Sequence, residues 1–138
     1  MFDQYEKSKD DMSAKEKSEL VEMICGELVV HAQIEEEIFY PALRAAGDEK
    51  LQELLDEAEV EHSGAKNLIA QLEDATPEEP IYDAKVTVLG EQIKHHVKEE
   101  EGEMFPMAKK SKNLDLDALG EQMRKRADVL KQELGLDA

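Results

Sequence analysis

His31-Ala-Gln-Ile-Glu35-Glu-Glu-Ile-Phe-Tyr-Pro41 and His96-Val-Lys-Glu-Glu100-Glu-Gly-Glu-Met-Phe-Pro106 are two copies of one pattern. In each copy a glutamate follows the histidine by four residues and a proline follows it by ten. Residues four apart lie on one face of an α-helix, so the imidazole and the carboxylate point the same way. The repeat therefore predicts two helices that each carry a pair of metal ligands.

The composition indicates a single domain built from long helices. The chain has 138 residues, of which 37% are charged, with only 7 glycines and 4 prolines. This length suffices for one hydrophobic core, and such a composition favours helix over sheet. Cys25 is the single cysteine, so no disulfide can form within the chain, and we expect a small core residue in a reducing compartment.

The net charge argues against two classes of binding partner. A formal charge of −17 would repel nucleic-acid phosphates and anionic lipids, so we expect neither nucleic acid nor membrane as a partner. No apolar run approaches the length of a membrane span, and the first residues do not resemble a secretory signal. We therefore expect a cytoplasmic protein whose acidic surface attracts cations.

Helix start and stop signals divide the chain. Ser13-Ala-Lys-Glu16 is a capping box, Gly47 is a stop, and Thr76-Pro77-Glu78-Glu79 is a second capping signature. Together with similar signals they predict a stub over 2–9 and helices over 13–46, 48–73, 76–110 and 113–135. We expect one domain over 1–138, with a stub and loop at 1–12, metal-binding helices at 13–111 and a C-terminal helix at 112–138.

The three long helices carry apolar stripes at three- and four-residue steps, which predicts an all-α, up-and-down antiparallel four-helix bundle. Five ionisable residues lie on these stripes: His31, Glu35, His62, His96 and Glu100. His31 lies 16 residues before Gly47 and His62 lies 15 after it, so both reach one height in an antiparallel pair. The five side chains are expected to converge at one level of the core.

A single histidine on an apolar stripe is more often an ordinary core residue than a ligand. Five ionisable groups at one depth are different, because buried carboxylates repel unless they are protonated or bound by a cation. Imidazole and carboxylate together suit iron, manganese or zinc. His95 is expected on the solvated face. The other residues are assigned to an acidic outer face (Glu36, Glu37, Glu99, Glu101 and Glu103) or to a core or lid beside the site (Phe39, Tyr40 and Phe105).

The two repeats, with Glu61-His62 between them, resemble the hemerythrin-like, or HHE cation-binding, domain over about residues 13–110. The resemblance implies a four-helix bundle that holds two non-haem irons. It implies that His31, His62 and His96 are iron ligands and that Glu35 and Glu100 are bridging carboxylates. It further implies a protein that binds oxygen or nitric oxide, or that senses iron or redox state, rather than an enzyme.

The chain departs from that family at its start, because the family has a further histidine on the first helix and no histidine precedes His31 here. Either the sequence starts inside the first helix or the site is incomplete. Where the family's oxygen carriers have a second histidine on the third helix, this chain has Ala58 or Lys66. This departure argues against stable reversible oxygen carriage.

Two other classes of function remain open. A ferritin-like iron oxidase would need inward Glu-x-x-His pairs, and Glu59-Val-Glu-His62 is one, but His31 and His96 precede their carboxylates. A metal-free helical interaction module is the other alternative.

A short first helix would leave an apolar groove. Either the C-terminal helix or a second copy of the chain could cover it, and we expect a homodimer in preference to the C-terminal helix. That helix has its own apolar stripe and is expected to pack on the bundle: Leu116, Leu119, Met123, Ala127, Leu130 and Leu134.

Overall fold

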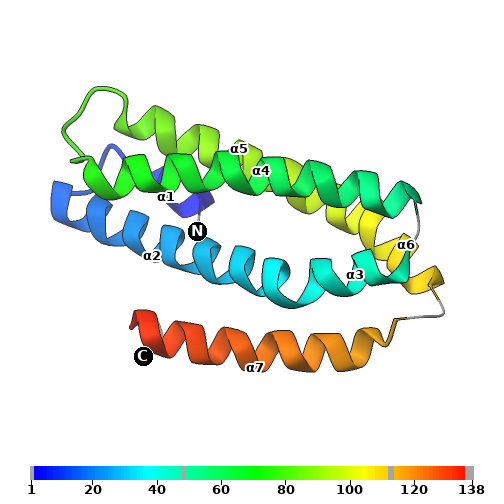
Figure 1. Cartoon of the computed structure of the whole chain (residues 1–138). Coiled ribbons are helices and arrows are strands. Elements are labelled where there is room, and N and C mark those ends of the chain that lie inside the picture. The colour runs from blue at the N-terminus through cyan, green and yellow to red at the C-terminus, as the bar shows by residue number, and fades with distance from the viewer. Residues whose placement is uncertain (1, 48, 112–113, 136–138) are drawn as a thin grey trace.

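The computed structural model describes residues 2–47, 49–111 and 114–135, and over these ranges it is a helical bundle without strands. Its elements are α1 (Phe2–Ser8), α2 (Ala14–Ile34), η1 (Glu35–Phe39), α3 (Tyr40–Ala46), α4 (Glu49–Asp74), α5 (Tyr82–Glu99), η2 (Glu100–Met104), α6 (Phe105–Lys110) and α7 (Leu116–Leu134). The helix α4 runs antiparallel to two rods, one formed by α2, η1 and α3 and the other formed by α5, η2 and α6 (Figure 1). The all-α bundle with a short first helix and a C-terminal helix is confirmed.

Several helix ends lie where the sequence predicts them. The Ser13 hydroxyl accepts a hydrogen bond from the Glu16 N–H, and the Glu16 carboxylate accepts one from the Ser13 N–H, so the capping box is present. Gly47 and Gly135 end their helices with φ of 79° and 73°, a left-handed conformation that glycine adopts without steric cost. Asp115 caps α7 through the N–H of Ala118.

The predicted start of the 76–110 helix is wrong. The helix begins at Tyr82, and Thr76–Pro77–Glu78–Glu79 form a turn before it. Pro80 explains the difference, because a helix starting at 76 would place this proline beyond the first helical positions. There its missing N–H and its ring would disrupt the first turn.

Both long rods contain a π-helical segment that the periodicity did not predict. The Tyr40 N–H donates to the Glu35 carbonyl, and the Phe105 N–H donates to the Glu100 carbonyl, five residues back in each case. The prolines of the two repeats follow directly, and a proline cannot donate to the carbonyl four residues before it and clashes with it. The wider turn accommodates this clash. Each π segment begins at the glutamate of its repeat.

Most buried apolar residues of the described ranges form two clusters at opposite ends of the bundle, and a smaller third cluster lies where α7 meets α2. One cluster joins α1 and the first half of α2 to the second half of α4 and to α5, with Cys25 buried in it as expected. The other joins η1 and α3 to the first half of α4 and to α6. The level between them is occupied by buried polar side chains. The fold therefore places a polar site between two dry cores.

The first helix is anchored at one end of the bundle. The fully buried Tyr5 donates a hydrogen bond from its hydroxyl to Asp83 Oδ1 on α5, and Lys17 Nζ on α2 lies 3.2 Å from the same oxygen. The ring of Phe2 lies against Gly90, where a Cβ atom would meet it at 3.0 Å. These contacts fix α1 between α2 and α5 (Figure 1).

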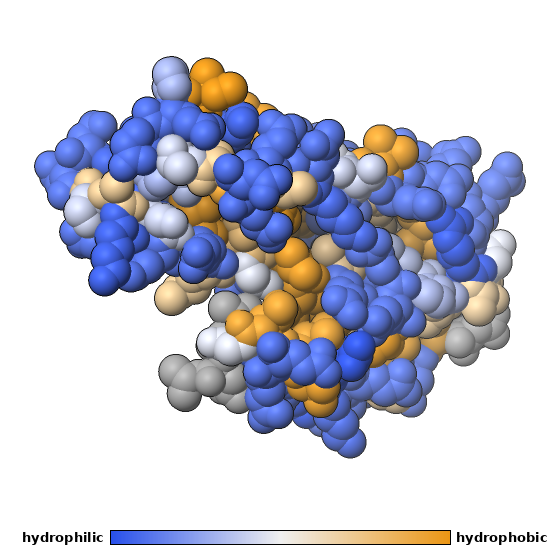
Figure 2. Space-filling model, turned by 60° about the vertical axis from the view of Figure 1, so that its left-hand side comes forward, coloured by the Kyte–Doolittle hydropathy of each residue, from blue (hydrophilic) through white to orange (hydrophobic). Residues whose placement is uncertain are grey.

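The C-terminal helix α7 packs on the bundle as expected, and it runs along α2 (Figure 1). Leu130 packs against Val30 and Ile34, and the Arg126 guanidinium lies 2.9 Å from Glu37 on η1. Apolar side chains gather where α7 meets the bundle (Figure 2). The sequence favours a homodimer over the C-terminal helix as the partner that covers the apolar face. This preference is wrong for the part of α2 that α7 covers. The homodimer itself remains a prediction.

The helices of the described ranges include none that is both long enough and apolar enough to cross a membrane.

Candidate metal centre

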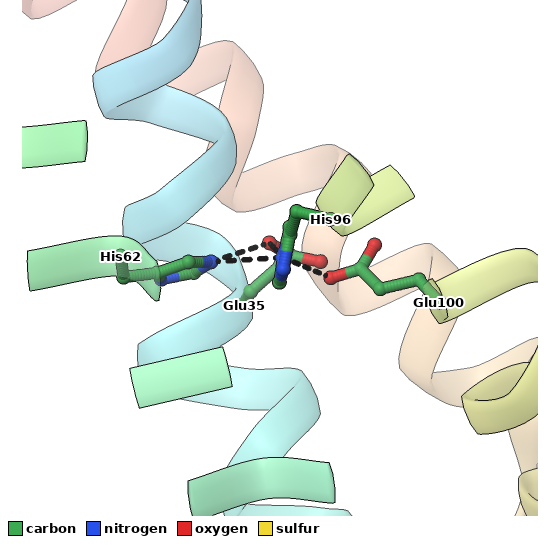
Figure 3. Close-up of side chains that lie close together, drawn as sticks. All are labelled: Glu35, His62, His96 and Glu100. Carbon is green, nitrogen blue, oxygen red and sulfur yellow. Dashed lines mark hydrogen bonds and ion pairs between the residues drawn. The ribbon is translucent and has the colours of Figure 1, made fainter. Parts of the chain in front are cut away.

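Four of the five predicted site residues meet in the layer between the two apolar clusters. Glu35 comes from η1, His62 from α4, His96 from α5 and Glu100 from η2, and their side chains point toward one another (Figure 3). All four are buried, with the Glu35 residue only 2% exposed. Each residue offers one ligand atom, and these four atoms lie within 4.8 Å of one another, which is close enough to share a metal ion.

The local structure explains this convergence. Glu35 and Glu100 are the first residues of the two π segments, so both carboxylates leave the backbone at the start of a widened turn. His96 lies one turn before Glu100, and its Nε2 atom is 2.7 Å from Glu100 Oε1. His62 lies near the middle of α4, and its Nε2 is 3.2 Å from both Glu35 Oε1 and His96 Nε2. Two imidazoles and two carboxylates therefore share one small volume.

The donor set fits a metal ion. Glu35 Oε1 is buried and accepts no hydrogen bond in the described part of the chain, although three imidazole nitrogens approach it. A buried carboxylate oxygen without a hydrogen-bond donor is costly in a protein interior. A cation bound between the imidazoles and the carboxylates would satisfy it, and mixed nitrogen and oxygen ligands suit iron, manganese or zinc.

The pKa shifts within the metal-free cluster also indicate a place for a cation. Burial alone would raise the pKa of Glu35, but its contacts with the histidines outweigh burial and lower the pKa well below its usual range. Burial would lower the pKa of His96, but Glu100 and Glu35 raise it to about 10. For Glu100, burial and the neighbouring Glu35 raise the pKa despite the bond to His96. A protonated His96 thus takes the place of a cation between two carboxylates.

The fifth predicted residue, His31, lies outside the buried set. Its side chain is 56% exposed, although its Nε2 atom is 3.5 Å from Glu35 Oε1. The expectation that all five polar residues face inward is therefore wrong for His31. The cause is a gap in packing, because His31 borders two cavities. It can still turn toward Glu35, and the nearby Glu35 carboxylate raises the pKa of His31.

Tyr40 belongs to the cluster, although we had expected it only as a core or lid residue. Its hydroxyl donates to Glu100 Oε1 at 2.7 Å and lies 3.1 Å from His96 Nε2 and 3.3 Å from His62 Nε2. Burial and the charges of Glu35 and Glu100 raise the pKa of Tyr40, so the phenol keeps its proton in this environment. The signal in the sequence was its position five residues after Glu35, one π turn along the rod.

Two further carboxylates lie beside the outer nitrogens of the buried imidazoles. Glu61 Oε2 forms a hydrogen bond of 3.2 Å with His96 Nδ1, whereas Glu36 Oε2 lies 3.5 Å from His62 Nδ1, which has no hydrogen-bond partner in the described part of the chain. A partner at Nδ1 of His96 would keep a proton there and leave Nε2 free to bind a metal ion. Glu36 is also paired with Lys66. We had assigned Glu36 mainly to the solvated surface. Glu61 is part of the Glu61-His62 pair that resembles the family, but its contact with His96 was not predicted because it stands beside the inward stripe of α4.

The remaining outer-face expectations hold in part. His95 is exposed as predicted, with a side chain 65% accessible. Glu37, Glu101 and Glu103 are exposed too, whereas Glu99 is only half-buried against α4. Phe39 is buried in the apolar cluster beside the site, and Phe105 covers it from the partly exposed side at a ring-centroid distance of 5.6 Å.

Two cavities reach the cluster from different sides. The larger, of about 360 Å³, lies between η1, α6 and α7 and has His31, Glu35 and Met123 in its wall. The smaller, of about 40 Å³, is lined mainly by apolar side chains of α2, α4 and α5 and touches His62 and His96. Both are large enough for a small molecule of two or three atoms.

Comparison with known proteins agrees with this geometry. A curated DNA nickase from Nostoc sp. (strain PCC 7120 / SAG 25.82 / UTEX 2576) is 31% identical over 106 residues, which are 76% of this chain and 28% of that protein. The chain therefore spans little more than a quarter of that relative. No solved structure matches this chain. Residues 1–108 match the family described as the hemerythrin HHE cation binding domain, and the chain belongs to this family.

Proposed function

We propose that the chain binds non-haem iron in a dinuclear site and uses it to bind a small ligand such as oxygen or nitric oxide, or to sense iron or redox state. One observation carries the proposal, namely the buried convergence of two imidazole Nε2 atoms and two carboxylates around the unsatisfied Glu35 Oε1. Bound iron would supply open coordination positions for a diatomic ligand and a change of oxidation state.

The residues divide into ligands and supports. His62, His96, Glu35 and Glu100 are the proposed ligands, and His31 joins them by turning its exposed ring inward toward Glu35. Glu61 holds the Nδ1 side of His96, and Glu36 lies near the Nδ1 side of His62. The Tyr40 hydroxyl donates its proton to Glu100 and so holds this carboxylate in place.

The surroundings suit a small apolar ligand better than a large one. The smaller cavity borders His62 and His96 and has mainly apolar walls, and the larger cavity borders Glu35 on the other side. Apolar walls exclude water and admit gases, and they lower the local dielectric around charged ligands. The arrangement supports binding or sensing rather than turnover of a bulky substrate.

DNA nicking is not carried over from the curated relative. The shared region makes up 28% of that protein, so its activity cannot be assigned to this segment. The formal charge of −17 also opposes contact with DNA phosphates.

Anaerobic iron titration tests the proposal. Fe²⁺ is added to the metal-free protein without oxygen, and optical spectra are recorded before and after oxidation. We expect two irons per chain and near-ultraviolet and visible absorption after oxidation, as a bridged diferric centre gives. The His62→Ala/His96→Ala variant should lose this absorption. A Glu91→Ala/Glu103→Ala variant, with both changes on exposed positions of the same rod, should keep it.

Two results would contradict the proposal. Unchanged iron binding in the histidine variant would show that the cluster is not the site. Protein purified from iron-supplied cells without any bound transition metal, and unable to take up Fe²⁺ afterwards, would favour a metal-free interaction module.

A further inference from the structure

A second group of metal-ligand side chains lies on the surface beside the buried cluster. Glu61 on α4 and His95 and Glu99 on α5 each offer one ligand atom, and these atoms lie within 4.8 Å of one another. The group combines two helices that pack side by side, so its spacing is fixed by the bundle rather than by one flexible loop.

The two carboxylates of this group form ion pairs with imidazoles, Glu99 with His95 and Glu61 with His96. His95 Nε2 lies 2.7 Å from Glu99 Oε1, and both carboxylates are only about a quarter exposed. In the described part of the chain neither Glu61 nor Glu99 forms an ion pair with a lysine or an arginine. Two carboxylates held side by side without a fixed positive charge repel each other, and a bound cation relieves this repulsion.

We propose that Glu61, His95 and Glu99 form an outer binding site for one divalent transition-metal ion, separate from the buried cluster. One imidazole and two carboxylates favour first-row metals such as Fe²⁺, Co²⁺ or Zn²⁺ over Ca²⁺ and Mg²⁺, which prefer oxygen ligands alone. Because His95 is largely exposed, water completes the coordination. The outer site is therefore weaker than the buried one, and its ion exchanges readily.

The outer site is a neighbour of the inner cluster without depending on it. His96 stands between the two, with Nδ1 directed at Glu61 and Nε2 directed at Glu100. The outer ligands belong to side chains other than the four buried ones. The outer site can therefore be present whether or not the buried cluster binds iron, and its test can succeed or fail separately.

Calorimetric titration of the full chain with Co²⁺ tests this site. We expect wild-type protein to show two classes of Co²⁺-binding site. One class is tight, and the other consists of one ion per chain that binds at least tenfold more weakly. His95→Asn/Glu99→Gln should lose the weaker class and keep the tight one, which also shows that the variant is folded. Glu103→Gln removes one negative charge from an exposed position of the same rod and should keep both classes.

A complementary variant isolates the outer site. His62→Ala/Glu100→Gln should keep the weaker class alone, and Mn²⁺ should then broaden the His95 imidazole resonances first in proton spectra. The proposal is overturned if wild-type protein lacks a weaker class, or if that class survives in His95→Asn/Glu99→Gln. Loss of both classes in a folded His95→Asn/Glu99→Gln protein would also overturn it, because the two sites would then not be separate.

Discussion

The two repeats of the chain are almost the same in sequence and differ in structure. Glu35 and Glu100 both begin a π segment and both are buried. Their histidines differ, because the side chain of His96 is 6% exposed and that of His31 is 56% exposed. His96 packs against α4, whereas His31 borders two cavities. A sequence motif determines which face of a helix carries its side chains, but the neighbouring helix determines whether that face is buried.

The largest expected difference is between His96→Ala and His31→Ala. Removing His96 leaves Glu100 and Glu35 buried without the imidazolium between them, which should lower the free energy of unfolding of the metal-free protein by about 3–5 kcal/mol. Removing the exposed His31 should change it by less than about 0.5 kcal/mol. Urea unfolding at pH 7 measures both values. Equal losses in the two variants would show that the repeats are equivalent.

The next comparison concerns the aromatic residue before each proline, Tyr40 in one repeat and Phe105 in the other. Tyr40→Phe removes the donor to Glu100 and should cost about 1–3 kcal/mol of unfolding free energy. Phe105→Tyr, at a partly exposed position, should cost less than about 0.5 kcal/mol. Urea unfolding checks both variants, and a neutral Tyr40→Phe would mean that the hydroxyl is dispensable to the cluster.

A smaller effect is expected at α1, which packs against α2 and α5 at the end of the bundle away from both π segments. Burial alone would raise the pKa of Asp83, but bonds from Tyr5 and Lys17 lower it. A lowered pKa stabilises the fold above the unfolded value near 3.8, and this contribution disappears as the pH falls through the folded value. Tyr5→Phe should therefore cost about 0.5–1.5 kcal/mol at pH 7 and less at pH 3. Urea unfolding at both pH values tests this, and a cost that is larger at pH 3 would contradict the assignment.

The last prediction concerns the chemical reactivity of the histidine side chains and not the stability of the fold. Diethyl pyrocarbonate should modify His31 and His95 of the metal-free protein rapidly, because their side chains are exposed, and His62 and His96 slowly. Mass spectrometry of peptides taken over time separates the four sites. Modification of His31 as slow as that of His96 would show that its ring is turned inward in solution.

Local signals predicted much of the fold. The Ser13 capping box, Gly47, Asp115 and Gly135 lie at helix ends as expected, since each acts through backbone groups within a few residues. The false start at Thr76 has a local cause as well. Pro80 follows the capping signature by only a few residues, so the first turn of a helix starting at Thr76 cannot form regularly.

Non-local packing accounts for the rest. The convergence of Glu35, His62, His96 and Glu100 follows from periodicity and loop length, both of which the sequence contains. The exposure of His31 and the place of α7 along α2 depend on which helices meet across the bundle. Tyr40 was missed because a regular α-helix would turn it away from Glu35, and the π segment brings its hydroxyl into the cluster.

The π segments also make the fold sensitive to the number of residues between each glutamate and its proline. One residue corresponds to about 100° of rotation around a helix. Deleting a single residue within 35–39 would convert the segment into a regular turn and place Tyr40 four residues after Glu35, which keeps it on the same helix face. Tyr40 and Leu43 would still face the core, but Pro41 would then meet the carbonyl of the regular turn before it. An insertion within 35–39 would instead rotate both side chains away from the core, so we expect these stretches to tolerate the loss of a residue better than the gain of one.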